Sequence, residues 1–380
     1  MVFETIATAA LDKNPNQIYP APDRLTKLPH RRVLICVLSA LAAGLVLMAA
    51  SSYAQFVYVA NGGGSNDVSA YRLGEDGALT PVPGSPFPAG NLPASVAVDP
   101  TGKFAYVVNE GGNNVSAYRI GKNGALTPIP GSPFPAEIDP HEVAVDPTGK
   151  FAYVANAVSN NISAYRIGKN GALAPIPGSP FAAGSFPRSA AVDPGGTFLY
   201  AANQVSNDVS AYRIRQDGAL TPLPGSPFAA GVGPCSVAVD AATKFAYVVN
   251  EGGGNVSAYQ IGENGGLKPI PGSPFAAGSD PVDVATNPSA KFAYVANQVS
   301  HNVSAYRVDE NGALIPLPQS PFGAGTECVS VGADPTGKFV YVASKFNHNV
   351  SAFRVGANGT LTPVAGSPFP AGVGPNSVAF

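Results

Sequence analysis

The residues able to do chemistry in this chain stand out because they interrupt a repeated sequence. One position, five residues before a turn aspartate or its equivalent, holds in order Ala94, His141, Arg188, Cys235, Val282, Val329 and Asn376. The next position is serine in five repeats but Glu142 and Asp283 in the other two. A histidine or glutamate can act as general base on water, and an arginine can hold an anion or a developing oxyanion. His141, Glu142 and Arg188 are therefore the candidate catalytic group.

A second set of unusual residues follows the YVAN-like motif of each repeat. It comprises Glu110, Glu251, His301, Lys345 and His348. Together with Asp283, we expect Glu110, Glu251, His301 and His348 to form a binding rim around the same site. All three histidines found after residue 55 then belong to this one face of the molecule.

The adjacency of His141 and Glu142 limits what they can do together. Successive side chains of a regular strand point to opposite faces, so we expect His141 and Arg188 to be the inward pair. Glu142 is then a partner of the neighbouring repeat. The alternative is that all three are solvated residues of a degenerate repeat.

These residues are set in a repeat that fills the chain after residue 55. An FxYVAN-like motif begins at Phe56, Phe104, Phe151, Phe198, Phe245, Phe292 and Phe339. The first spacing is 48 residues and the others are 47, and a fixed period of this length indicates a repeat architecture. Each repeat holds four runs typified by SVAV, FAYVAN, NVSAYRI and LTPIPGSPF. The first three favour strands, and the proline-rich fourth suits an outer edge strand.

Four-stranded units repeated radially are the blades of a β-propeller. The first repeat starts at its second run, and the chain ends at Ser377 to Phe380, which is a first run with nothing after it. We therefore predict an all-β, seven-bladed propeller of four-stranded antiparallel blades, closed by the C-terminal strand pairing into the N-terminal blade. A linear solenoid is the alternative, but it needs atypical capping repeats, which the sequence lacks.

A propeller of this kind places the candidate residues on one rim. The loop entering the first strand and the loop joining the second and third strands share that rim. The Asp-Pro-Thr-Gly and Gly-Lys-Asn-Gly turns, which are nearly uniform among the repeats, lie on the other. We expect ligands at the mouth of the central channel on the first rim, because a concave site with converging polar groups is the usual ligand site.

Residues 1–54 do not belong to the repeat. An apolar run of 18 residues, Val33 to Ala50, follows His30-Arg31-Arg32 and precedes Ser52-Tyr53-Ala54. This pattern is typical of a signal peptide cleaved before Gln55, and the run is also long enough to anchor the chain in a membrane. We expect residues 1–54 to be a signal peptide or membrane anchor and residues 55–380 to be the propeller. The protein is then exported to the periplasm, the cell surface or the medium, and it touches a membrane only through an uncleaved segment.

Charge and cysteine usage exclude several classes of partner. Residues 1–54 hold five of the 22 basic and three of the 24 acidic residues, so their removal leaves a net charge of −4. The remaining chain has no basic run, and nucleic acid is not an expected partner. Cys235 and Cys328 begin first strands two repeats apart, which is beyond disulfide reach, so we expect two free thiols.

No motif for a metal or cofactor is present. The sequence lacks HExxH, CxxC, GxSxG and Walker patterns. A metal held by His141, His301 and His348 has no supporting spacing. We therefore expect neither a metal nor a cofactor, and a monomeric protein.

The repeat resembles a known family. The stretch PHEVAVDPTGKFAYVAN, Pro140 to Asn156, and its copies over residues 56–380 are similar to the seven-bladed lactonase propellers. That group includes the 6-phosphogluconolactonase and carboxymuconate cycloisomerase types and the related YVTN-repeat propellers. The resemblance implies a lactone-processing site at the channel mouth, with His141 carried over in its Pro-His context and Arg188 as a further candidate. Two features depart from those enzymes: the blades are almost interchangeable, and the chain carries an export-like N-terminus.

Three functions therefore remain open. The first is an exported lactonase-like propeller that hydrolyses a small, sugar-type lactone. The second is a non-catalytic propeller that binds a carbohydrate or glycan, a peptide or an extracytoplasmic protein on the same rim. The third is a structural or surface-array protein without a small ligand.

Overall fold

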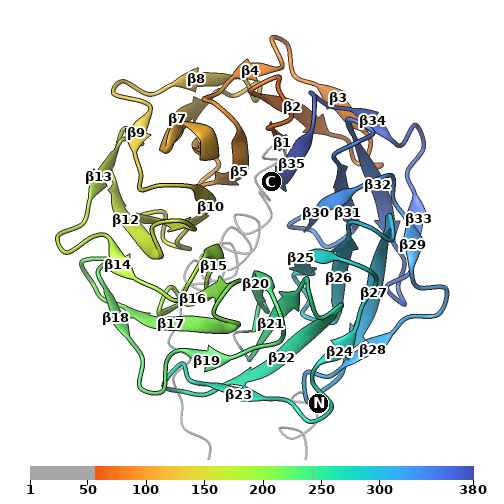
Figure 1. The fold of residues 1–380 in the computed structure, drawn as a ribbon. Coiled ribbons are helices and arrows are strands. Elements are labelled where there is room, and N and C mark those ends of the chain that lie inside the picture. The colour runs from red at the N-terminus through yellow and green to blue at the C-terminus, as the bar shows by residue number, and fades with distance from the viewer. Residues whose placement is uncertain (1–55, 243) are drawn as a thin grey trace, which may run out of the picture. The chain divides into compact units, whose positions relative to one another are not determined.

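The computed structural model describes residues 56–242 and 244–380, and these form seven β-sheets arranged in a ring (Figure 1). We number the sheets as blades 1 to 7 along the chain. The seven-bladed propeller predicted from the repeat is confirmed. The predicted signal peptide or membrane anchor, including the apolar run Val33 to Ala50, lies outside the described residues. Within them, no helix has the length and apolar character needed to cross a membrane.

The first strand of each blade lies nearest the axis of the ring. These strands are β35 (Pro375–Ala379) in blade 1, then β5 (Pro93–Val98), β10 (Pro140–Val145), β15 (Pro187–Val192), β20 (Pro234–Val239), β25 (Pro281–Thr286) and β30 (Cys328–Ala333).

The second strands form the middle of each sheet and are the most buried part of the fold. They are β1 (Phe56–Asn61), β6 (Phe104–Asn109), β11 (Phe151–Asn156), β16 (Phe198–Asn203), β21 (Phe245–Asn250), β26 (Phe292–Asn297) and β31 (Phe339–Ser344). Every residue of β11 is buried. The reason is that both of its faces carry apolar side chains and both are covered by neighbouring blades, as the FAYV pattern predicted.

The third strands pair antiparallel with the second. They are β2 (Asp67–Leu73), β7 (Asn114–Ile120), β12 (Asn161–Ile167), β17 (Asp208–Ile214), β22 (Asn255–Ile261), β27 (Asn302–Val308) and β32 (Asn349–Val355). A single turn of 3₁₀ helix, η1 (Glu110–Gly112), interrupts the loop between β6 and β7.

The proline-rich fourth run differs from the prediction of one edge strand. It forms two short strands, and both pair with the third strand of the same blade. Prolines within the run cannot donate to a continuous ladder, so the pairing breaks between them. The two short strands of each blade, from blade 1 to blade 7, are β3 (Leu79–Pro81) and β4 (Phe87–Pro88), β8 (Leu126–Pro128) and β9 (Phe134–Pro135), β13 (Leu173–Pro175) and β14 (Phe181–Ala182), β18 (Leu220–Pro222) and β19 (Phe228–Ala229), β23 (Leu267–Pro269) and β24 (Phe275–Ala276), β28 (Leu314–Pro316) and β29 (Phe322–Gly323), and β33 (Leu361–Pro363) and β34 (Phe369–Pro370).

The ring closes as predicted. Strand β35 pairs antiparallel with β1, with Val378 opposite Val59. The apolar core lies between adjacent blades, and one of its clusters joins Val57 and Val59 of blade 1 to Phe339 and Tyr341 of blade 7. The closing interface is therefore built like the other interfaces in the ring.

A circuit of tyrosine hydroxyls also links the blades. The central tyrosine of each second strand donates to a glycine carbonyl in the next blade. The pairs are Tyr58 with Gly124, Tyr106 with Gly171, Tyr153 with Gly218, Tyr200 with Gly265, Tyr247 with Gly312, Tyr294 with Gly359 and Tyr341 with Gly77, at 2.8–3.2 Å. These glycines end the Gly-Lys-Asn-Gly type of turn, where Gly171 has a φ of 86° that favours glycine. The uniform turns of this rim thus join neighbouring blades.

Candidate functional site

The candidate catalytic position lies at a β-bulge that every blade repeats. In blade 3, Pro140 pairs with Asn156 and Glu142 pairs with Ala155, so His141 is the extra residue. Arg188 occupies the same place between Pro187 and Ser189 in blade 4. A bulge redirects a side chain and interrupts the regular alternation of a strand. We predicted opposite directions for His141 and Glu142 from the regular alternation of side chains along a strand. That alternation does not hold at the bulge.

The two groups of candidate residues share one rim, as predicted. In blade 3 the backbone N–H of Ala157, which follows β11, donates to the Asp139 carbonyl before β10 at 2.8 Å. Glu110 and Glu251 make the equivalent backbone bonds in blades 2 and 5. We call the surface formed by these two sets of loops, together with the first three residues of each strand that they enter, the site rim.

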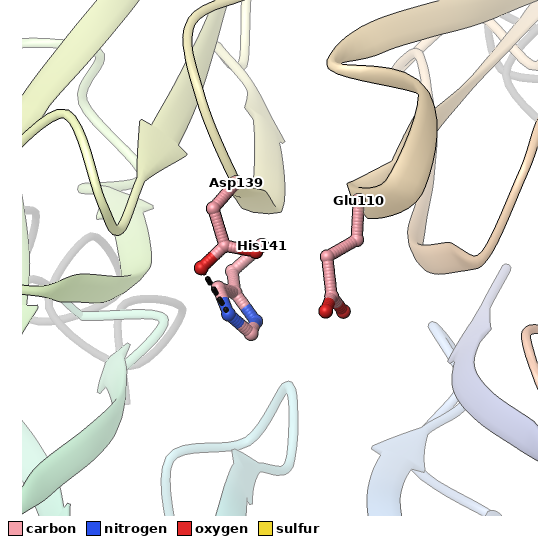
Figure 2. Close-up of side chains that lie close together, drawn as sticks. All are labelled: Glu110, Asp139 and His141. Carbon is pink, nitrogen blue, oxygen red and sulfur yellow. Dashed lines mark ion pairs between the residues drawn. The ribbon is translucent and has the colours of Figure 1, made fainter.

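His141 lies between two carboxylates and an aromatic ring. Its Nε2 is 3.5 Å from an oxygen of Asp139, and its ring centroid is 5.9 Å from that of Phe186. Glu110 reaches the same space from blade 2 (Figure 2). Burial, and then the positive charge of Arg188, hold the pKa of His141 below its usual value, while Asp139 and Glu110 oppose this. The imidazole is therefore neutral at pH 7 and able to accept a proton.

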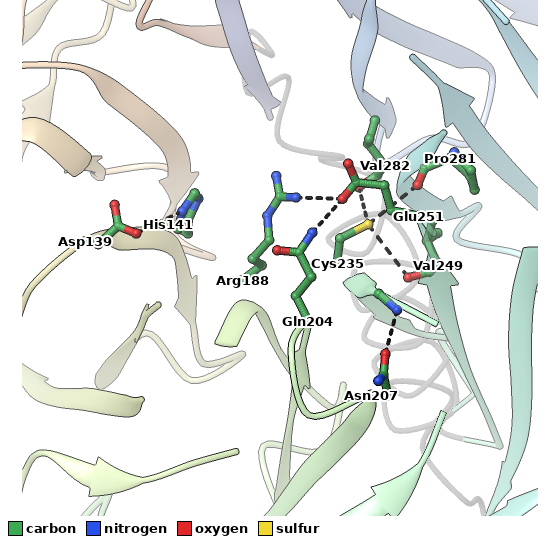
Figure 3. A network of polar contacts seen from close by, with 11 residues as sticks. Asp139, His141, Arg188, Gln204, Asn207, Cys235, Val249, Glu251, Pro281 and Val282 are labelled. Atoms are coloured by element: carbon green, nitrogen blue, oxygen red, sulfur yellow. Dashed lines mark hydrogen bonds and ion pairs between the residues drawn. The ribbon is translucent and has the colours of Figure 1, made fainter. Parts of the chain in front are cut away.

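Arg188 is held by a separate polar network in blades 4 and 5. Its Nη1 donates to Glu251 Oε2 at 2.8 Å, and Gln204 Nε2 donates to the same oxygen at 2.7 Å (Figure 3). The Arg188 side chain is 29% exposed, so the pair is partly shielded from water. A guanidinium has five N–H donors, and the single bond to Glu251 leaves others for a ligand.

Glu142 contacts the neighbouring blade, as we expected for it if His141 and Arg188 form the inward pair. Its carboxylate accepts a hydrogen bond from the backbone N–H of Ala190 at 3.0 Å. Ala190 lies two residues after Arg188 on β15. Burial raises the pKa of Glu142 to about 7, and the charge of Asp283 adds to this. Glu142 thus ties the strand that bears His141 to the strand that bears Arg188.

Asp283 of blade 6 also links neighbouring blades through its carboxylate. It accepts hydrogen bonds from the Ser236 hydroxyl in blade 5 and from the Val331 N–H in blade 7, both at 2.9 Å. Burial raises its pKa. In most other blades a serine makes the equivalent bond, for example Ser189 to Val237. Glu142 and Asp283 therefore replace the serine that accepts this inter-blade hydrogen bond, with a longer side chain that can ionise.

His301 and His348 occupy a position that is asparagine in four other blades. In those blades the asparagine side chain accepts a bond from the entry loop of the next blade, as Asn113 does from the Asp139 N–H at 2.9 Å. The Nδ1 atoms of His301 and His348 accept the equivalent bonds, from Glu327 and Gly374, at 3.1 and 3.0 Å. Both histidines also have positive φ. They hold loops, and they do not contact the group around His141.

The two cysteines of the described residues are free and buried, as expected. Burial raises the pKa of Cys235 to about 12 and that of Cys328 to about 11. The Cys235 thiol faces backbone carbonyls, including that of Val282 at 3.4 Å. Neither thiol is suited to act as a nucleophile.

Sequence reasoning missed Asp139, Gln204 and Phe186, which contact the candidate residues. Each could have been found by the comparison that revealed His141. The position just before the first strand of each blade reads Leu92, Asp139, Phe186, Gly233, Asp280, Glu327 and Gly374 around the ring. The position after the YVAN motif reads Gly62, Glu110, Ala157, Gln204, Glu251, Gln298 and Lys345.

Within the described residues, one group has the ligand types and spacing for a metal ion. Potential ligand atoms of Glu110, Asp139 and His141 all lie within 4.8 Å of one another. The charge of Arg188, which already depresses the pKa of His141, opposes a cation there. Two shallow depressions of about 540 and 420 Å³ lie away from the site rim, lined by residues such as Arg213 and Lys268, and include no candidate residue.

The fold and the site rim define a closed seven-bladed propeller with a histidine and an arginine at matching bulges of adjacent blades. A family model described as "Lactonase, 7-bladed beta-propeller" matches residues 48–233 and 215–380. The chain belongs to this family of seven-bladed lactonase propellers. No curated protein matches the chain.

Solved structures share the fold at low sequence identity. A candidate 6-phosphogluconolactonase from Bacteroides fragilis is 22% identical, with a TM-score of 0.76 over 87% of this chain and 98% of that one. A periplasmic gluconolactonase from Pseudomonas aeruginosa is 20% identical, with a TM-score of 0.73 over 85% and 98%. The hydrazine synthase of Kuenenia stuttgartiensis is 18% identical, with a TM-score of 0.59 over 76% and 89%. The similarity therefore extends to a protein named for different chemistry, and it establishes the fold alone.

Proposed function

We propose that this protein hydrolyses a small lactone at the site rim, with His141 as general base and Arg188 as oxyanion partner. The observation that carries the proposal is their placement. They occupy one register position on adjacent blades, at bulges that redirect both side chains. Each is also held by an acid, His141 by Asp139 and Arg188 by Glu251. Membership of the lactonase propeller family supports the reaction class.

The neutral imidazole suits the first step. His141 takes a proton from water as the water oxygen attacks the lactone carbonyl, and Asp139 stabilises the imidazolium that forms. Arg188 donates to the carbonyl oxygen as it becomes negatively charged. The ring C–O bond then breaks, and the leaving alkoxide receives the proton from His141. The product is an open hydroxy acid, and the imidazole returns to its neutral form.

Glu142 acts in this scheme as a positioning residue. Its bond to Ala190 connects β10 and β15, so it fixes the distance between the base and the oxyanion partner. Glu251 and Gln204 fix the direction of the guanidinium in the same way. His301, His348 and Asp283 stay outside the reaction.

Lactone hydrolysis by His141 and Arg188 variants tests the proposal. The repeat itself supplies compatible residues, because Ala94 occupies the same bulge in blade 2. His141→Ala should lower kcat/KM for a hydrolysed lactone by about 10²–10⁴-fold, and Arg188→Ala by about 10²–10³-fold. His301→Asn is the matched control, since asparagine already holds this loop in four blades, and its activity should equal wild type.

Two outcomes would overturn the reaction. One is the absence of hydrolysis with any lactone, which favours the non-catalytic binding alternative. The other is full activity in His141→Ala. Treatment with EDTA should leave the rate unchanged, and a loss restored by a divalent metal would instead assign Glu110, Asp139 and His141 to a metal.

A further inference from the structure

The charges of the site rim are unequal. Among the described residues it carries two basic side chains, Arg188 and Lys345. These lie in blades 4 and 7, and Arg188 is already paired with Glu251. The acids of the same rim are Asp67, Glu110, Glu137, Asp139, Glu142, Asp208, Glu251, Asp280, Asp283 and Glu327. A phosphate or carboxylate bound near Arg188 would find no second cation, whereas proteins usually recognise such groups with several.

Apolar side chains are exposed on the same rim. Nine large apolar residues are exposed in the described part of the chain, and eight of them lie on the site rim: Leu92, Ile138, Val158, Val205, Val232, Val299, Phe346 and Val373. Four of these, Ile138, Val158, Val205 and Val232, belong to blades 3 to 5 and are 52–62% exposed. These blades carry His141, Arg188 and Glu251.

The repeat does not require apolar residues at these places. The position of Ile138 and Val232 is Asn91, Ser185, Ser279 or Thr326 in other blades. The position of Val158 and Val205 is Gly63, Gly111 or Gly252 in three others. Since the fold tolerates small or polar residues here, packing does not explain the apolar ones.

Phe186 adds an aromatic side chain to this apolar set. It lies against His141 and has a φ of 61°. The equivalent residue is glycine in blades 1 and 5, which adopts this left-handed conformation without the penalty that a bulky side chain incurs. An aromatic residue therefore occupies a strained position directly beside the proposed base.

We infer that the substrate is an uncharged lactone bearing an apolar substituent, such as an alkyl chain, rather than a phosphorylated or otherwise anionic one. The inference rests on the proposed function and names its substrate class. The lactone ring lies between His141 and Arg188, and the apolar substituent lies over Phe186, Ile138 and Val205. A phosphoryl group in that place would meet the rim acids.

A series of lactones that differ in chain length tests this. The probes are γ-butyrolactone, γ-octalactone and γ-decalactone, with neutral gluconolactone and anionic 6-phosphogluconolactone as a pair that differs in charge. Burial of a methylene group contributes about 0.8 kcal/mol, so kcat/KM should rise about two- to fourfold per methylene over the first few. The phosphorylated sugar lactone should be the poorer substrate of its pair.

Variants borrowed from other blades show which residues are responsible. Ile138→Ser, Val205→Gly and Val232→Ser, combined, should flatten the chain-length dependence, so that γ-decalactone loses its advantage in kcat/KM over γ-butyrolactone. Val299→Gly with Val373→Ser, at rim loops of blades 6 and 1, is the matched control and should keep the dependence. Equal losses in both sets would overturn the inference, as would a preference for the phosphorylated lactone.

Binding separates this inference from the proposed reaction. The corresponding γ-lactams resist hydrolysis, and their affinity can be measured by calorimetry whether or not any lactone is turned over. Affinity that rises with chain length supports the apolar class. Affinity that is absent or independent of chain length refutes it, even if short lactones are hydrolysed.

Discussion

Replacing Glu142 with glutamine should change how the stability of the protein depends on pH. In the folded protein burial raises the pKa of this carboxyl from 4.5 to about 7. A carboxyl with a raised folded pKa stabilises the fold fully below pH 4.5, and this contribution is lost as the pH rises through 7. Glutamine is neutral at every pH, and its carbonyl can still accept the bond from the Ala190 N–H.

The size of the effect follows from the shift. Each pKa unit corresponds to about 1.4 kcal/mol, so the shift sets an upper bound of about 3 kcal/mol. Glu142 is half-buried, and solvent screening reduces this to about 1–2 kcal/mol. The variant and wild type should therefore be equally stable at pH 4, and the variant should be more stable by that amount at pH 8.

Urea unfolding, followed by tyrosine fluorescence because the chain has no tryptophan, measures this at each pH. The pH dependence of groups that do not interact with Glu142 cancels in the difference between the two proteins. Glu75→Gln, at an exposed turn, is the control and should show no trend. A difference between wild type and Glu142→Gln that is the same at pH 4 and pH 8 would refute the buried, protonated state that we assign to Glu142.

Four other predictions concern the site, the ring and the N-terminus. The charge of Arg188 helps to depress the pKa of His141, so Arg188→Ala should raise that pKa in an NMR titration; an unchanged value would place the two side chains apart. In wild type kcat/KM should fall as the pH drops through the same His141 pKa, below 6.5. Tyr341→Phe and Tyr153→Phe should each cost about 1–3 kcal/mol in urea unfolding, because each leaves a buried carbonyl unpaired; a much smaller loss at Tyr341 than at Tyr153 would mean an open ring. We also predict cleavage before Gln55, so N-terminal sequencing of the mature protein should begin at Gln55, and an intact Met1 would favour an anchor.

The architecture could be predicted from the sequence because the period leaves little choice. Because FxYVAN recurs every 47 residues, one repeat defines the strands and turns of every blade. It also predicts on which rim of the propeller each residue lies. Strand β35 at the chain end was predicted as the closing strand, and its pairing with β1 is confirmed. The split of the fourth run into two strands was not predicted. Residue propensities indicate that prolines interrupt the pairing of strands, but they do not indicate where the pairing begins again.

The geometry within the site was harder to predict. The bulge at His141 is an added residue in one strand, and SVAV patterns alone do not reveal which residue is unpaired. Asp139 and Phe186 take left-handed conformations, which a bulky residue such as phenylalanine rarely adopts. Their proximity to His141 depends on that backbone geometry, so residue type alone could not indicate it.

The near-identity of the blades provides the criterion for separating candidates from supports. A residue that departs from the repeat is structural when it makes the same bond as the residue that it replaces. His301 and His348 meet this test, since their Nδ1 atoms accept the bond that asparagine accepts elsewhere. Glu142 and Asp283 meet it through the serine that they replace. His141 and Arg188 do not, because Ala94, Val282 and Val329 occupy the same bulge without side-chain hydrogen-bonding groups. The fold does not need a base or a cation there, so these two residues are the ones to assign to chemistry.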